Sequence, residues 1–133
     1  MKFSKILLGI ILSIILLFGI LFLILDSFIR VELDELNGTG EIQETYFSPN
    51  KKYQADFFII NEGGATEGYQ ERVSITSLDD NRKEFNDKTI YWLYPSNDKI
   101  SIVWESNNII IINGKTIDIK DQNTYYNWKK DNK

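Results

Sequence analysis

The chain has 133 residues, a formal net charge of −4, and neither histidine nor cysteine. Nucleophilic catalysis of the Ser-His-Asp and Cys-His kinds is therefore impossible, and zinc or haem sites with the usual ligand sets cannot be built. The acidic balance also argues against nucleic acid as a partner.

The run from Ile6 to Leu25 is apolar throughout and carries no charged side chain. A helix of about twenty residues rises roughly 30 Å, the thickness of the hydrocarbon core of a bilayer. A secretory signal would have a shorter apolar run and a small-residue cleavage site, whereas this run ends in Leu-Asp-Ser-Phe-Ile-Arg. We therefore predict a retained transmembrane helix over residues 6–25 rather than a cleaved signal.

The charges on either side of this segment predict its orientation. Lys2 and Lys5 precede it without any acid, and all 19 acidic residues follow it. The positive-inside rule then places residues 1–5 in the cytoplasm and the rest of the chain outside, so we expect a single-pass protein of the cell membrane.

Residues 26–47 contain six acids and one base, with a glycine-containing turn at residues 37–40. A cation site near the membrane is one interpretation of this charge. We favour a solvated acidic stalk that holds the following domain away from anionic lipid headgroups.

From residue 48 onward, apolar and polar residues alternate with the period of a half-buried strand, as in Tyr53, Ala55 and Phe57. The Asn113-Gly114 pair between two apolar runs predicts a hairpin with a type I′ turn. About six strands are expected, at residues 53–59, 69–78, 89–94, 99–105, 108–112 and 115–120. The final stretch, residues 121–133, is open between a short helix, a last strand and a frayed end. The predicted fold is mainly β: an N-terminal helix, then a small antiparallel meander or sandwich over residues 48–133.

Two segments are candidates for a contact surface. The first is a glycine-rich loop at residues 61–68. Its glycine spacing resembles that of a phosphate-binding loop, but Tyr69 and Gln70 stand where that motif needs a lysine and a hydroxyl residue. We interpret it as a strand connection that could contact a partner. Aromatic residues near the C-terminus fall outside any clear strand, whereas Trp92 and Trp104 are expected in the core. The candidate residues are Gly63, Gly64, Thr66, Tyr125, Tyr126 and Trp128.

Several short motifs in this order resemble a family of small bacterial membrane-anchored proteins of unknown function. They are Ser48–Tyr53, Gly63–Thr66, Val73–Ile75, Ile90–Trp92, Ile102–Trp104 and Ile112–Lys115. The resemblance covers roughly residues 48–119 and implies a hydrophobic N-terminal segment followed by a short β-rich domain. It implies no activity.

These observations favour a membrane protein that presents an extracytoplasmic β-domain as a binding or interaction module. The expected partners are the bilayer and, beyond it, another membrane or cell-envelope protein; we expect no nucleic acid, cofactor or metal. An alternative is an accessory subunit of a membrane complex, assembled through small residues such as Gly9 and Ser13 on the helix. A hydrolase working through paired carboxylates is a third alternative, but a small sheet domain rarely provides the deep cleft it needs, so we expect no enzyme.

Overall fold

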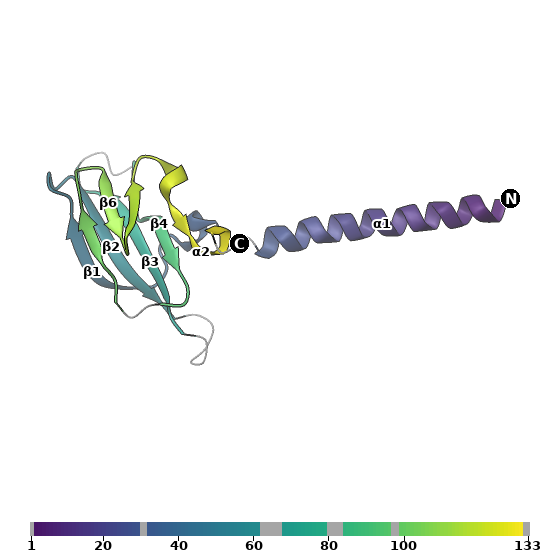
Figure 1. Ribbon diagram of the computed structural model, residues 1–133, viewed down its shortest axis with the longest axis horizontal. Helices are drawn as coiled ribbons and strands as arrows, with labels where there is room; N and C mark the ends of the chain where they lie inside the picture. Colours follow the sequence, from purple (N-terminus) through teal and green to yellow (C-terminus); the bar gives the residue numbers. More distant parts are fainter. Residues whose placement is uncertain (1, 30–31, 62–67, 80–83, 97–98, 132–133) are drawn as a thin grey trace. The chain divides into compact units, whose positions relative to one another are not determined.

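The computed structural model describes residues 2–29, 32–61, 68–79, 84–96 and 99–131. The chain divides into two compact units, residues 1–31 and residues 32–133 (Figure 1). The first is a single helix, and the second holds all the strands of the described chain.

The helix α1 spans Lys2–Ile29 and contains the whole predicted apolar segment. Residues 6–25 of this helix carry no charged side chain. The Ser13 hydroxyl donates a hydrogen bond to the Gly9 carbonyl oxygen at 2.9 Å, which satisfies it within the helix. The helix is therefore long and apolar enough to cross a membrane, although a signal sequence has the same character.

The second unit begins with a five-stranded sheet. Its order is β1-β2-β3-β4-β8, and every neighbouring pair is antiparallel except β4 and β8, which are parallel. The strands are β1 (Glu41–Phe47), β2 (Tyr53–Ile60), β3 (Gln70–Ser77), β4 (Lys88–Leu93) and β8 (Tyr126–Asn127).

A second sheet, of three antiparallel strands, consists of β5 (Ile102–Trp104), β6 (Ile109–Ile112) and β7 (Lys115–Asp118). Asn113 and Gly114, which join β6 to β7, have φ angles of 51° and 81°. Positive φ at both positions is what a type I′ turn requires, so the predicted hairpin is confirmed.

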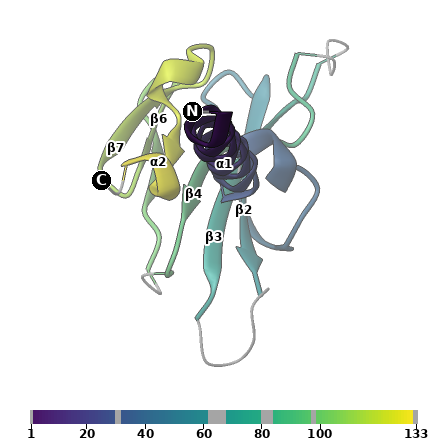
Figure 2. The same ribbon diagram turned by 90° about the vertical axis from the view of Figure 1, so that its right-hand side faces the viewer.

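The two sheets share one hydrophobic core, and Figure 2 shows β6 and β7 to one side of β2, β3 and β4. The predicted alternation is confirmed on β2, where Tyr53, Ala55 and Phe57 face this core. From the three-stranded sheet, Ile110 and Ile117 are fully buried. The mainly β fold class is therefore confirmed, in the form of a small sandwich.

The structure corrects the predicted stalk over residues 26–47. Residues 32–47 belong to the β unit: Leu33–Leu36 form the 3-10 helix η1, and residues 41–47 form β1. Strand β1 shows no apolar alternation in the sequence because nearly all of its side chains, including the acidic ones, are exposed. An edge strand tolerates such charges, and they help to prevent unwanted pairing with other chains.

With β1 and β8 added to the six predicted strands, the described chain has eight. The C-terminal stretch, for which a short helix, a last strand and a frayed end were left open, contains both helix and strand in its described part. Residues 122–131 contain the 3-10 helix η2 (Gln122–Thr124), the short strand β8 and the helix α2 (Trp128–Asp131).

Candidate functional site

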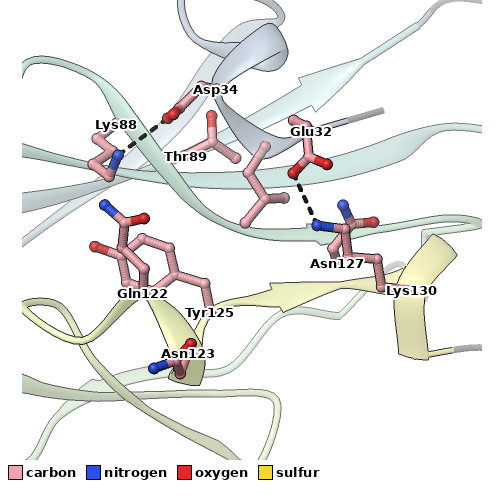
Figure 3. Close-up of a pocket in the computed structure, with 10 residues that line it drawn as sticks. Glu32, Asp34, Lys88, Thr89, Gln122, Asn123, Tyr125, Asn127 and Lys130 are labelled. Atoms are coloured by element: carbon pink, nitrogen blue, oxygen red, sulfur yellow. Dashed lines mark hydrogen bonds and ion pairs between the residues drawn. The ribbon is translucent and has the colours of Figure 1, made fainter. Parts of the chain in front are cut away.

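A polar cavity of about 360 Å³ lies between the start of the β unit, strand β4 and the C-terminal segment (Figure 3). Ten residues of the described chain line it. These residues are Glu32, Leu33, Asp34, Lys88, Thr89, Gln122, Asn123, Tyr125, Asn127 and Lys130. We call this space the polar cavity.

The first wall of the polar cavity is fixed by hydrogen bonds that dock the segment around η1 onto the five-stranded sheet. The Asn37 side-chain oxygen accepts from both the backbone N–H and the hydroxyl of Thr89, each at 2.8 Å. The Nε of Arg72 donates to the Thr39 carbonyl oxygen at 3.0 Å. Residues 32–39 therefore lie on the sheet as part of the folded unit.

Arg72 is completely buried, although it is always charged at neutral pH. Its two terminal nitrogens donate to the two carboxylate oxygens of Asp87 at 3.1 and 3.2 Å, and one of them also reaches the Thr89 hydroxyl at 3.1 Å. The guanidinium lies 3.9 Å from the centre of the Phe58 ring. The Gly38 N–H donates to Asp87 at 2.6 Å, which ties the same carboxylate to the docked segment.

Four charged side chains of the polar cavity form two ion pairs, which Figure 3 shows as dashed lines. Lys88 lies 3.1 Å from Asp34, and Lys130 lies 2.8 Å from Glu32. Asp34 and Glu32 are both well exposed, with 67% and 58% of their side-chain surface accessible. Exposed pairs of this kind contribute little stability, so a ligand could rearrange them at small cost.

The opposite wall comes from η2 and the residue that follows it. The Asp121 carboxylate accepts from the Asn123 N–H at 3.0 Å and caps η2, and the Thr124 hydroxyl donates to the Asp118 carbonyl oxygen at 3.0 Å. The Tyr125 hydroxyl donates to the Ile119 carbonyl oxygen, which orients the ring beside the cavity. Burial, followed by the nearby carboxylates of Asp34, Asp118 and Asp121, raises the pKa of Tyr125 to about 12, so the phenol stays neutral at physiological pH.

The described lining of the polar cavity offers carboxylates, ammonium groups, side-chain amides and hydroxyls, all of which form hydrogen bonds. Within the described ranges, no group of three or more histidine, cysteine, aspartate or glutamate side chains could hold a metal ion. The side-chain amides of Gln122 and Asn123 are exposed and donate or accept no hydrogen bond within the described protein. These two amides can form hydrogen bonds with a polar ligand.

The structure describes three of the six predicted contact residues. Gly63, Gly64 and Thr66 lie outside the described residues. Tyr125 lines the polar cavity, but the other two aromatic rings pack elsewhere. Tyr126 stacks on Tyr91 with ring centres 5.2 Å apart, and Trp128 contacts Trp92 at 5.4 Å and Tyr94 at 5.3 Å.

Trp92 is buried, with 3% of its surface exposed, and Trp104 packs against the shared core, as predicted for both. The remaining lining of the polar cavity was missed by sequence reasoning. Asp34 and Lys88 meet across 54 residues of chain, and Glu32 and Lys130 across 98. No local pattern signals such a pairing.

A second cavity, of about 730 Å³, opens where β1, β2 and β3 approach the connection between β4 and β5. Its walls include Phe57, Ile59 and Ile100, and the buried Glu71 carboxylate accepts from the Ser96 hydroxyl at 2.8 Å. Residues 62–67 and 97–98, which adjoin these elements in sequence, lie outside the described chain. We treat the polar cavity as the candidate site because the exposed side-chain amides of Gln122 and Asn123 line it.

A family model of proteins of unknown function, DUF5412, matches residues 3–131. The chain belongs to this family. The match confirms the resemblance to an uncharacterised family that the motifs suggested, and it extends over both units of this DUF5412 protein. No curated protein and no solved structure shows a significant match. The polar cavity must therefore be interpreted from its own chemistry.

Proposed function

We propose that this DUF5412 protein is a single-pass membrane protein whose β unit lies outside the cytoplasm and binds a ligand in the polar cavity. The observation that carries the proposal is the polar cavity itself, because three distant parts of the chain meet there around amides that no described protein group uses. Ligand sites are typically concave and carry a few converging polar groups.

The charge distribution supports the proposed topology. Lys2 and Lys5 precede the apolar helix, whereas the 19 acidic residues of the chain all follow it. Basic residues close to one end of a membrane helix favour that end on the cytoplasmic side. The β unit follows the helix directly, since α1 ends at Ile29 and the unit begins at residue 32.

The topology can be tested with single cysteines because the natural chain has none. We choose Gln122→Cys in the polar cavity and Ser4→Cys in the N-terminal tail. A membrane-impermeant maleimide added to intact cells should label the first variant and spare the second. Permeabilisation should then expose Ser4→Cys to the reagent. Labelling of Ser4→Cys alone before permeabilisation would contradict the proposed orientation.

A second candidate function is an accessory subunit of a membrane complex, assembled through α1. A Cβ atom built at Gly9 would meet nothing within 4 Å, so this surface of the helix can accept a close neighbour. Gly9 and Ser13 have the small-xxx-small spacing found where membrane helices pack closely. Replacing α1 by an unrelated apolar helix should abolish crosslinking to partners under this alternative, and should leave ligand binding intact under the first proposal.

A further inference from the structure

The described lining of the polar cavity has a balanced charge, which restricts the ligands it can favour. Its charged side chains within the described ranges are Glu32, Asp34, Lys88 and Lys130, and their formal charges cancel. Each ammonium group already lies within 3.1 Å of a carboxylate. An anion would meet the two carboxylates as well as the two lysines, and a cation would meet the two lysines as well as the two carboxylates, so these four groups give neither ion a net electrostatic attraction.

An apolar ligand is equally poorly matched to this lining. Among the described lining residues, Leu33 is the one aliphatic side chain, and the aromatic contribution is the ring of Tyr125. The other groups are carboxylates, ammonium groups, amides and a hydroxyl. Burying an apolar molecule there would remove these polar groups from water without giving them new hydrogen bonds, which is unfavourable.

Hydrogen bonding within the protein shows which groups are left for a ligand. Thr89 already donates its hydroxyl to Asn37 at 2.8 Å and accepts from Arg72 at 3.1 Å. The Tyr125 hydroxyl is held by the Ile119 carbonyl oxygen, so Tyr125 offers its ring. The amides of Gln122 and Asn123 remain, and each presents both a donor and an acceptor. Figure 3 draws Gln122, Asn123 and Tyr125 among the residues that line the polar cavity.

We propose that the polar cavity binds an uncharged, polyhydroxylated sugar. Neighbouring sugar hydroxyls both donate and accept, which matches the paired capacities of the amides of Gln122 and Asn123. The C–H face of the sugar ring would lie against Tyr125, and outer hydroxyls could bridge the exposed ion pairs without displacing a charge. The cavity volume of about 360 Å³ suits a small ligand of one or two sugar rings. This inference rests on the proposed function, since it names the ligand class for the same site.

The test uses the full chain in lipid nanodiscs with isotope-labelled glutamine and asparagine side chains. N,N′-Diacetylchitobiose and cellobiose are titrated as neutral disaccharides, and inorganic phosphate and spermidine as an anion and a cation. We expect one or both disaccharides to shift the Gln122 and Asn123 side-chain amide resonances saturably. We expect phosphate and spermidine to have no saturable effect on these resonances.

Two variants separate binding in the polar cavity from binding elsewhere. Gln122→Ala should weaken disaccharide binding by about tenfold, as expected for loss of one or two hydrogen bonds. Tyr125→Leu removes the flat ring and should weaken it by a similar factor. The matched control is Gln43→Ala, since Gln43 is also exposed but lines the second cavity; it should leave the affinity unchanged.

Three results would overturn the sugar assignment. They are saturable binding of phosphate or spermidine in place of sugar, disaccharide binding that Gln122→Ala leaves intact, and no response to either disaccharide. Binding of an ion would overturn the ligand class and leave the proposed binding function standing. Failure of the proposed topology would appear separately, in the labelling of the single-cysteine variants in cells.

Discussion

Replacing Asp87 by asparagine tests whether the buried Arg72 holds the start of the β unit on the sheet. The exchange keeps the shape of the side chain, and asparagine tolerates the positive φ of 52° found at this position. Arg72 has no exposed surface, so its charge would remain in the interior without its carboxylate partner. The perturbation is therefore electrostatic rather than steric.

The structure allows the cost of Asp87→Asn to be worked out. One carboxylate oxygen accepts from Arg72 at 3.2 Å and from the Gly38 N–H at 2.6 Å. An amide nitrogen at that position would donate where both neighbours also donate, so two charge-assisted hydrogen bonds are lost. Each is worth about 1.5–3 kcal/mol, and breaking a buried ion pair typically costs about 3–5 kcal/mol. We expect the free energy of unfolding to fall by about 3–5 kcal/mol.

Two further variants sharpen this prediction. Arg72→Met removes the buried charge and leaves Asp87, whose side chain is 28% exposed, able to contact water. It should cost less than Asp87→Asn, about 2 kcal/mol. Glu84→Gln is a matched acid-to-amide control in the exposed pair with Lys120, and it should cost less than about 1 kcal/mol.

The assay is urea unfolding of the full chain in nanodiscs, followed by tryptophan fluorescence. All three tryptophans belong to the β unit, so they report its unfolding and not that of α1. A loss below about 1 kcal/mol for Asp87→Asn, or a larger loss for Arg72→Met, would refute the assigned role of the pair.

Three other substitutions test the core, the hairpin and the response to pH. Ile117→Ala, at a fully buried position, should lower the free energy of unfolding by about 2–5 kcal/mol in the same urea assay, and a loss under about 1 kcal/mol would argue against the shared core. Asn113→Ala should lower the free energy of unfolding by about 2–3 kcal/mol. The Asn113 side chain donates to the Tyr91 hydroxyl at 2.8 Å and accepts from the Ser101 N–H at 2.9 Å, and the residue has a positive φ. Asn113→Gly permits this φ, so it should lower the free energy of unfolding by less. Burial raises the pKa of Tyr91 from 10.0 to about 12, so the stability from its neutral phenol is complete below pH 10 and is lost as pH rises to about 12. Tyr91→Phe should therefore flatten the alkaline decline in unfolding free energy by about 2 kcal/mol, whereas an unchanged decline would remove Tyr91 as its cause.

Local periodicity predicted much of the fold. The alternation through Tyr53, Ala55 and Phe57 and the Asn113-Gly114 turn are both determined by residues close in sequence, and both were predicted correctly. β1 escaped prediction because an exposed edge strand has no buried face to impose alternation. β8 escaped because two residues, paired in parallel with β4, leave no periodic signal.

The candidate site was much less predictable. Tyr125 was identified as a contact residue because it lies outside a clear strand, and it does line the polar cavity. The pairs Asp34–Lys88 and Glu32–Lys130 depend on how the start and end of the β unit meet. The acidic charge of residues 26–47 suggested a separate stalk. Charge alone does not reveal the hydrogen bonds from Arg72 and Thr89 that dock residues 32–39 onto the sheet.

The central claim, an outer β unit that binds a ligand in the polar cavity, is tested most directly by labelling Leu33→Cys in intact cells, because Leu33 lines the polar cavity and is assigned no bond to the sugar. We expect an impermeant maleimide to label this position without permeabilisation, and N,N′-diacetylchitobiose or cellobiose to slow the labelling in proportion to occupancy. The same sugars should not slow labelling of Asn108→Cys, an exposed position outside the described lining of the polar cavity. Labelling of Leu33→Cys only after permeabilisation, or at a rate that neither sugar changes, would contradict the claim.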